Sequence, residues 1–428
     1  MSAPVAKINQ KKVIRLAVFL LCIALLIFVY QQVVVGRRNA DPGLFDSTGY
    51  MAASMETGDG QQAVLITPDG TITPSPGYKA GMMDSPPIFA KTKDGTRLFF
   101  ASDREDDQSH VFRWNPAQNI VERRTLDKRT KSGICFTVPG DDSNLTALVI
   151  SGGTVLELDP HDGKSKQVLP PRSLRADGTS ENGAKGQFDE LYASIGSSFK
   201  IARWSKEKQY IIAVLRRDAG EILIAQNMTD MSKPPIIVGA AEHVDFDFNP
   251  VTGDVIFTLQ GFQFPDPEHI PEAYVKNGKV NLPFKNMLGI YTPGDAQPKA
   301  PVALGQDNTM KDGKMVSEDN VCFGQPRVSP DGSTIFVIVG TLKAATAFEP
   351  KGAVLMAAES GGSQKSKTIL KDPVYDPTWD PTGKLLAFTA DVNGKRAILT
   401  INVETGERKN VTGDKGNFHG PVFGIDHK

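Results

Sequence analysis

A unit of short apolar runs separated by turn signals recurs along this chain. Its clearest copy is PTWDPTGKLLAFTADVNGKRAILTINVETGERKNVT, Pro377 to Thr412. The runs Leu385 to Thr389 and Ala397 to Ile401 are rich in strand-forming residues, and Asp-Pro-Thr-Gly, Asp-Val-Asn-Gly and Glu-Thr-Gly segments separate the runs as turns. The unit therefore predicts four antiparallel strands, named a, b, c and d in chain order. One such sheet cannot bury both of its faces alone.

The same order of strands and turns is found five more times before this copy, at spacings of roughly 40 to 65 residues. The repeats begin with the segments Pro86 to Ser102, Cys135 to Gly152, Ile201 to Asn227, Val244 to Gln260 and Gln325 to Gly340. Repeated four-stranded units of this kind stack into a closed body, so the chain is expected to be all-β.

The two ends of the repeat region are incomplete in complementary ways. Gly49 to Ser75 reads as strands b, c and d with no strand a before them, and His419 to Asp426 reads as a strand a with nothing after it. Pairing the last strand with the first three closes the ring and protects the sheet edges. The sequence thus predicts a seven-bladed β-propeller over residues 49–428, with six or eight blades as alternatives.

Two copies of the repeat resemble a known family. Pro377-Thr378-Trp379-Asp380-Pro381-Thr382-Gly383-Lys384 and Pro326-Arg327-Val328-Ser329-Pro330-Asp331-Gly332-Ser333 look like the P-x-W-S-P-D-G-K repeat of TolB-type propellers. The resemblance covers roughly Gly49 to Lys428 at uneven strength. It implies a propeller fold. TolB itself carries a separate N-terminal domain in the periplasm, which this chain does not have room for, so the resemblance implies the fold rather than TolB's own role.

The N-terminal segment is apolar and flanked by positive charges. Val13 to Val35 contains only Arg15, Gln31 and Gln32 as polar residues, and about 20 helical residues span a bilayer core of ~30 Å. A cleaved signal peptide is the alternative. Four positive charges precede its uninterrupted apolar part, which begins at Leu16, and two follow Val35. We therefore expect a cytoplasmic tail (1–12), a transmembrane helix (13–35), a linker (36–48), and a propeller held at the cytoplasmic membrane, in the periplasm or outside the cell.

Charge excludes one class of partner. The whole chain carries a formal charge of -1, but six positive charges and no acidic residue lie in the first 38 positions. The remaining chain is therefore mildly acidic and has no long basic stripe. This pattern argues against nucleic acid as a partner.

Loop lengths separate the two faces of the predicted propeller. The a-b and c-d turns lie on one face and are short, whereas the b-c and d-a connections lie on the other and include four long segments: Arg172 to Ser198, Gly261 to Met287, Gln306 to Asn320 and Thr341 to Lys351. Long loops on a rigid scaffold commonly bind partners. The segment Gly261 to Met287 has the most apolar anchors, so the candidate partner-binding residues are Phe262, Phe264, Ile270, Tyr274 and Phe284.

The inward positions of strand a supply a second candidate site. They are expected to line a central tunnel: Ile88, Thr137, Arg203, Asp247, Arg327, Thr378 and Val422. Arg203 and Arg327 could grip an anion or a partner's carboxylate, because arginine makes bidentate contacts. The competing interpretation is a water-filled tunnel in which these arginines and Asp247 pair with one another.

Motifs for catalysis and for metals are not found. The histidines are scattered, no H-E-x-x-H or G-x-S-x-G is present, and the acidic run Asp103-Arg104-Glu105-Asp106-Asp107 lacks the D-x-D-x-D-G spacing of a Ca²⁺ loop. We expect no cofactor and no catalytic residues. The predicted function is a non-catalytic scaffold that binds another envelope or membrane protein; a small-ligand receptor or an enzyme using the tunnel mouth is the alternative.

Overall fold

The computed structural model describes most of the repeat region. The described residues are 45–106, 108–125, 130–136, 145–171, 198–218, 220–231, 233–264, 270, 272, 275–280, 286–299, 302–304, 309–311, 314–316, 321–343, 347–358 and 366–425. The chain divides into two units, Met1–Phe45 and Asp46–Lys428. The expected tail, transmembrane helix and most of the linker lie outside the described residues. Within the described ranges, no helix has the length and apolar character needed to cross a bilayer.

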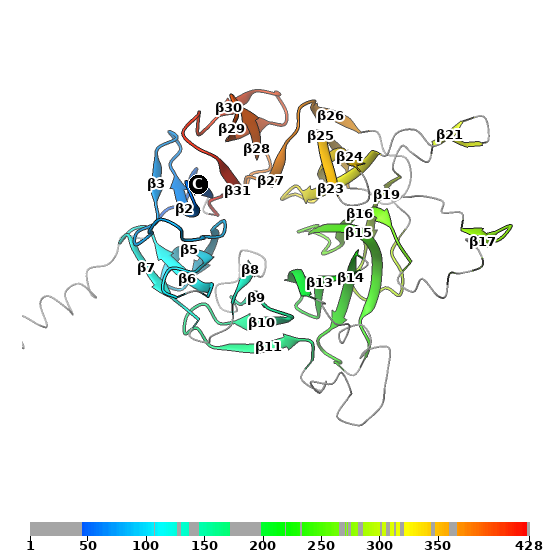
Figure 1. The fold of residues 1–428 in the computed structure, drawn as a ribbon, viewed down its shortest axis with the longest axis horizontal. Helices are drawn as coiled ribbons and strands as arrows, with labels where there is room; N and C mark the ends of the chain where they lie inside the picture. Colours follow the sequence, from blue (N-terminus) through cyan, green and yellow to red (C-terminus); the bar gives the residue numbers. More distant parts are fainter. Residues whose placement is uncertain are drawn as a thin grey trace, which may run out of the picture. The chain divides into compact units, whose positions relative to one another are not determined.

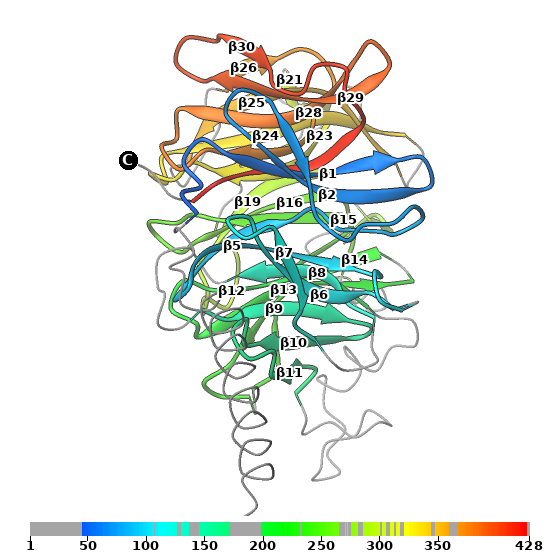
Figure 2. The same ribbon diagram turned by 90° about the vertical axis from the view of Figure 1, so that its left-hand side faces the viewer.

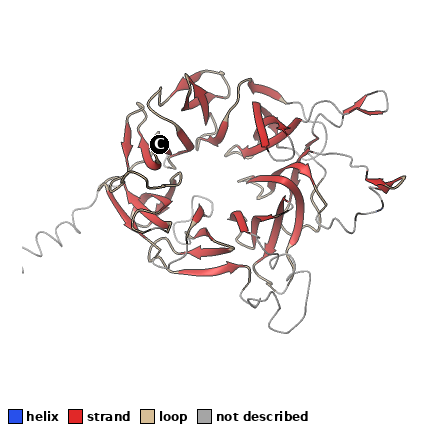
Figure 3. Ribbon diagram, viewed as in Figure 1, coloured by secondary structure: helices blue, strands red, loops and turns tan. Residues whose placement is uncertain are grey.

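The described regular elements are β-strands, which form six sheets that follow one another around a ring (Figures 1 and 3). Five sheets have four strands. They comprise β1 (Met51–Thr57), β2 (Gly60–Ile66), β3 (Ile72–Pro74) and β31 (Phe418–Phe423); β4 (Ile88–Thr92), β5 (Gly95–Ser102), β6 (His110–Asn115) and β7 (Ile120–Arg123); β8 (Ser132–Phe136), β9 (Ala147–Ser151), β10 (Thr154–Leu158) and β11 (Ser165–Leu169); β23 (Val321–Val328), β24 (Thr334–Lys343), β25 (Ala347–Ala357) and β26 (Lys367–Leu370); and β27 (Tyr375–Trp379), β28 (Leu385–Val392), β29 (Lys395–Asn402) and β30 (Arg408–Asn410).

The sixth sheet has seven strands, and its middle strand belongs to both halves. Its strands are β12 (Ser198–Trp204), β13 (Tyr210–Arg217), β14 (Gly220–Asn227), β15 (Ile236–Phe248), β16 (Val255–Phe262), β19 (Asn286–Tyr291) and β20 (Ala303–Leu304). The first half of β15, up to Ala241, pairs with β14, and the second half, from Ala241, pairs with β16. The predicted repeats that begin at Ile201 and Val244 are therefore joined through one continuous strand.

The expected closure of the ring is confirmed. Strand β31 from the C-terminal end pairs antiparallel with β1, so the order of the closing sheet is β3-β2-β1-β31. In Figure 2 the red C-terminal strand runs beside the blue strand β1. Phe418 of β31 is fully buried. The closure thus joins the two ends of the repeat region through both backbone pairing and a core side chain.

Apolar cores lie between successive sheets. Ala387 and Ile398 of the last complete sheet pack with Val64 and Phe418 of the closing sheet. The two halves of the seven-stranded sheet also face one another across a shared core, in which residues of β13 and β14 pack against residues of β15, β16 and β19. Further cores of this kind join other neighbouring sheets, which supplies the burial that a lone sheet lacks.

The insertions take two forms. Thr341 to Lys351, expected to be a long loop, is instead mostly strand, because β24 continues to Lys343 and β25 begins at Ala347 with these two residues paired. Two separate hairpins, β17 (Val275–Lys276) with β18 (Lys279–Val280) and β21 (Thr309–Lys311) with β22 (Lys314–Val316), pair with none of the ring sheets (β17 and β21 are labelled in Figure 1).

Candidate functional site

Strand a of the repeats lies toward the centre of the ring, as the labels β8, β23, β27 and β31 show in Figure 1. Three of the residues predicted for the inner strands come together there. The guanidinium of Arg203 on β12 lies 2.7 Å from the carboxylate of Asp247 on β15, and the other oxygen of Asp247 accepts the N–H of Val328 on β23 at 2.9 Å. Arg327, also on β23, donates to the carbonyl of Pro377 at 2.9 Å.

The pKa of Arg327 reflects its burial and the charges around it. Burial lowers the pKa of Arg327 below its usual value; Asp247 acts in the opposite direction and Arg203 in the same direction as burial. Arg203 also lies over the ring of Phe246, 5.6 Å from its centroid. Asp247 is therefore the carboxylate that allows the two arginines to share one region of the inner strands.

A second group of charges lies beside the first. The ammonium of Lys200 on β12 contacts Glu221 on β14 at 3.0 Å and Asp245 on β15 at 3.2 Å. Burial favours the neutral amine, but Asp245 and Glu221 together raise the pKa of Lys200. Burial likewise opposes ionisation of Asp245, but Lys200 and the N–H of Gln325 hold its pKa below the usual value.

One contact is repeated from blade to blade at the residue before the strand-a proline. A carboxylate oxygen of Asp245 accepts the N–H of Gln325 at 3.3 Å; the side-chain carbonyl of Gln325 accepts the N–H of Asp376 at 2.8 Å; and a carboxylate oxygen of Asp376 accepts the N–H of Gly420 at 3.2 Å. Gln325, Asp376 and Gly420 have positive φ angles of 47°, 52° and 55°. Residues other than glycine adopt this left-handed backbone at a cost in free energy. In Gln325 and Asp376 the hydrogen bonds just described hold it in place.

These contacts form a polar chain through β12, β15, β23, β27 and β31. The charged groups in the chain contact one another or backbone groups, so the paired-charge interpretation of Arg203, Asp247 and Arg327 agrees with the geometry. Anion binding by these residues stays a prediction.

The other predicted inward positions are apolar or uncharged. Ile88 packs against the core between the β4 and β8 sheets. Val422 pairs with Ala52, and Thr378 pairs with Ala387. Thr137 lies outside the described residues. Among the described predicted inward positions, the charged residues are therefore Arg203, Asp247 and Arg327 on β12, β15 and β23.

The candidate partner-binding residues are only partly described. Phe262 at the end of β16 packs against the core of the seven-stranded sheet, and Phe264 meets it edge to face with ring centroids 5.4 Å apart. Ile270 is half-buried. Tyr274 and Phe284 lie outside the described residues. The root of the insertion is therefore anchored in the ring.

The acidic run that follows β5 is engaged with neighbouring protein groups. Asp103 accepts the N–H of Met83, Glu105 pairs with Arg123, and Asp106 contacts both Arg123 and the buried His110. Asp107 is not described. In the part of the chain that the structure describes, no three His, Cys, Asp or Glu residues gather as a metal site would require.

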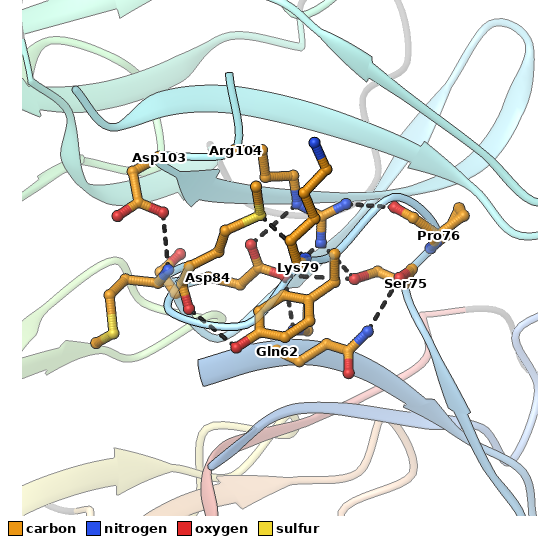
Figure 4. A network of polar contacts seen from close by, with 12 residues as sticks. Gln62, Ser75, Pro76, Lys79, Asp84, Asp103 and Arg104 are labelled. Atoms are coloured by element: carbon orange, nitrogen blue, oxygen red, sulfur yellow. Dashed lines mark hydrogen bonds and ion pairs between the residues drawn. The ribbon is translucent and has the colours of Figure 1, made fainter. Parts of the chain in front are cut away.

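A buried ion pair that the repeat pattern did not predict holds the β3–β4 connection (Figure 4). Arg104, which follows β5, pairs with Asp84, and their side chains are 5% and 0% exposed. Asp84 also accepts the N–H of Ala63 on β2, and Arg104 donates to the carbonyl of Pro76 and lies over the ring of Phe100. This network fixes the closing sheet to the next one.

Two sequence signals could have found more of these residues. Gln325, Asp376 and Gly420 each precede the strand-a proline, so alignment of the repeats on that proline places them in register. Asp245 and Asp247 alternate in Val244-Asp245-Phe246-Asp247-Phe248, which places both on the same face of a strand. No local signal marks Lys200, Glu221, Asp84 or Arg104.

Comparisons with known proteins give one local match in sequence. The chain is 31% identical over 61 residues to the Tol-Pal system protein TolB of Legionella pneumophila, with the same values for strains Corby and Paris. The match covers 14% of this chain and spans 15% of the length of these curated relatives. No protein-family model matches the chain.

Similar solved structures have low sequence identity. TolB from Acinetobacter baumannii is 11% identical, with a TM-score of 0.43, over 92% of this chain and 69% of its own. An oligogalacturonate lyase in complex with manganese is 8% identical, with a TM-score of 0.48, over 85% of each chain. The β-propeller domain of the Trilobed protease from Pyrococcus furiosus is 12% identical, with a TM-score of 0.47, over 86% of this chain and 96% of its own. By its repeats and its sheet order, this chain has a TolB-like β-propeller fold.

Proposed function

We propose that this protein is a non-catalytic, membrane-anchored propeller that binds another envelope protein through the insertion between β16 and β19. One observation carries the proposal. The β17–β18 hairpin inside this insertion pairs with no ring sheet, and its apolar cross-strand pair, Val275 and Val280, is 42% and 48% exposed. A small hairpin with apolar side chains in water gains stability when a partner covers it.

A comparison of the contacts at the two candidate sites favours the insertion between β16 and β19 as the binding site. Arg203, Asp247 and Arg327 contact one another or backbone groups of neighbouring blades. A ligand at the inner strands would have to compete with these contacts. Among the described strands, β17 and β18 pair only with each other, so a partner at this hairpin displaces no strand pairing with the ring.

Two further parts of the proposal concern architecture. We count the seven-stranded sheet as two blades joined through β15, which makes seven blades in all, and the divided pairing and shared core of that sheet support this count. We assign membrane attachment to Val13 to Val35 from its apolar sequence, with the propeller in the periplasm or outside the cell. A periplasm-active reporter fused after Lys428 tests the topology, and a silent reporter there would overturn it.

Site-specific photocrosslinking in cells tests the interaction. A photoreactive amino acid at Val275 or Val280 is expected to give a discrete crosslinked product. The matched control is Val251, a valine of similar exposure (54%) in the short turn at the opposite end of β16. Products at the hairpin and none at Val251 support the proposal; identical patterns at all three positions contradict it.

A further inference from the structure

The C-terminal strand β31 is joined to β1 by non-covalent contacts and not by a turn. In the other four-stranded sheets the two innermost strands follow one another in the chain, as β27 and β28 do. β31 and β1 come from opposite ends of the repeat region, and among the described strands β31 pairs with β1 only. The contacts at this junction therefore decide how readily the last strand of the ring opens.

A histidine and a glutamate meet across the junction. The imidazole Nε2 of His419 lies 2.8 Å from Oε1 of Glu56, and the two side chains are 25% and 43% exposed. His419 is the backbone partner of Ser54, and Glu56 lies two residues further along β1, on the same face of the sheet. The pair therefore bridges the two strands at the end of the junction where β31 begins.

Asn417 orients the carboxylate of Glu56. Its side-chain N–H donates to Oε2 of Glu56 at 2.7 Å, and its side-chain oxygen accepts the backbone N–H of Arg396 at 2.9 Å. The hydrogen bonds from His419 and Asn417 hold the pKa of Glu56 below its ordinary value of 4.5. Glu56 therefore stays ionised throughout the range in which histidines change charge, about pH 5–8.

Carboxylates on two neighbouring strands favour a positively charged imidazole. Glu56 of β1 contacts the ring of His419 directly. Asp376 of β27 lies close by, because its carboxylate accepts the N–H of Gly420, the next residue along β31, at 3.2 Å. A hydrogen bond between two charged groups is stronger than one from a neutral donor, so protonation of the imidazole strengthens its contact with Glu56.

Arg396 on β29 is a cation that opposes this effect. Its guanidinium lies over the ring of Tyr375, 4.1 Å from the centroid, and 3.9 Å from the carboxylate of Asp391 on β28. The positive charge of Arg396 is thus shared with other groups, whereas Glu56 contacts the imidazole itself. Strands β29 and β4 add one lysine each, Lys395 and Lys91.

We propose that His419 and Glu56 form a pH-responsive clasp, which tightens the pairing of β31 with β1 as the pH falls from about 8 to about 5.5. The proposal is independent of the proposed function. The neutral imidazole donates one hydrogen bond to Glu56, and the protonated imidazole turns the same contact into a salt bridge. The added stability is present in mild acid and is lost as the pH rises and the imidazole gives up its proton.

Hydrogen–deuterium exchange of the full-length protein tests the clasp. The protection factor of β31 is measured from about pH 8 to about pH 5.5 and corrected for the intrinsic effect of pH on amide exchange. Strand β13, in another sheet, is the internal reference. His419→Gln keeps a side-chain N–H donor but cannot gain a charge, and Glu56→Gln removes the carboxylate. The control is His161→Gln, which removes a histidine from the turn between β10 and β11.

The expected result is a roughly two- to fivefold rise in the protection of β31 in the wild type and in His161→Gln, with no rise at β13. Both His419→Gln and Glu56→Gln are expected to abolish the rise, and if one of them does not fold the other decides the test. Constant or falling protection of β31 in the wild type, an equal rise at β13, or a rise that persists in His419→Gln would overturn the proposal. Loss of the rise in His419→Gln but not in Glu56→Gln would also overturn it, and would assign the pH effect to Asp376.

Discussion

The carboxylate of Asp247 lies 2.7 Å from the guanidinium of Arg203 while it also accepts the N–H of Val328. One side chain thereby joins β12, β15 and β23, which are the inner strands of three successive repeats. The same arrangement recurs two residues earlier on β15, where the carboxylate of Asp245 contacts Lys200 and accepts the N–H of Gln325. The acidic residues of β15 therefore position the inner strands on both sides of it.

Asp247→Ala is expected to lower the free energy of unfolding by about 1.5–3 kcal/mol, the range for hydrogen bonds to charged groups. The loss leaves Arg203 and Arg327 near one another without their shared carboxylate. Urea unfolding followed by tryptophan fluorescence measures the change. The control is Asp372→Ala: Asp372 is 80% exposed and lies 3.9 Å from Arg408, so less than about 1 kcal/mol is expected. Equal losses in the two variants would rule out the role assigned to Asp247.

The Lys200–Asp245 contact predicts a dependence of stability on pH in acid. The folded protein holds the pKa of Asp245 below its ordinary value of 3.8, so the unfolded state binds the proton first as the pH falls. The contribution of Asp245 is present above about pH 3.8 and is lost as the pH falls through the folded pKa. Urea midpoints from about pH 7 to about pH 3 should therefore fall less steeply for Asp245→Asn than for the wild type.

In alkaline solution the Lys200–Asp245 pair is expected to lose stability as the pH rises, the opposite direction from acid. The contacts raise the pKa of Lys200 above 10.5, so its contribution is complete below that pH and is lost as the pH rises through the folded pKa. Lys200→Met should therefore remove part of the alkaline loss of stability. An unchanged alkaline slope would count against this ion pair.

Gly420→Ala is expected to destabilise the ring closure more than the same change at Gly394. Both glycines have positive φ, 55° and 78°, which costs alanine about 1–2 kcal/mol. At Gly420 a Cβ would also lie 2.6 Å from side-chain atoms of Pro86, whereas nothing lies within 4 Å at Gly394. The excess loss at Gly420 is expected to be about 1–3 kcal/mol. Thermal unfolding of the two variants measures it, and equal melting temperatures would contradict the close contact.

Arg104→Met is expected to destabilise the fold by about 3–5 kcal/mol, because it leaves the fully buried Asp84 carboxylate without its cation. The double variant Arg104→Met/Asp84→Ala should be more stable than Arg104→Met alone, since the uncompensated charge is gone. Denaturant unfolding of the single and double variants completes the test. A double variant less stable than the single one would show that Asp84 acts mainly through its contacts with Ala63 and Ser75.

The repeat determined most of the architecture because its signals are local. Asp-Pro-Thr-Gly and Asn-Gly turns and alternating apolar residues specify hairpins within one unit, so the strands around Pro377 to Thr412 and the unpaired ends at Gly49 and His419 were readable from sequence. The strand a expected at His419 to Asp426 is β31, and its pairing with β1 is as predicted. The joining of two repeats through β15 was not readable, because nothing in Ile236–Phe248 marks where one pairing partner replaces the other.

The inner-strand contacts depended on tertiary structure. The sequence named Arg203, Asp247 and Arg327 as inward residues, but which charge meets which is fixed by the stagger between inner strands, on which Asp247 lies 44 residues after Arg203 and 80 residues before Arg327. The Asp84–Arg104 pair has the same origin, since its partners approach only when two sheets pack. The sequence by itself determined the strands of the repeats and the closure of the ring. Only the tertiary structure decided the polar chain, because side chains distant in sequence acquire partners when neighbouring blades pack and water is excluded between them.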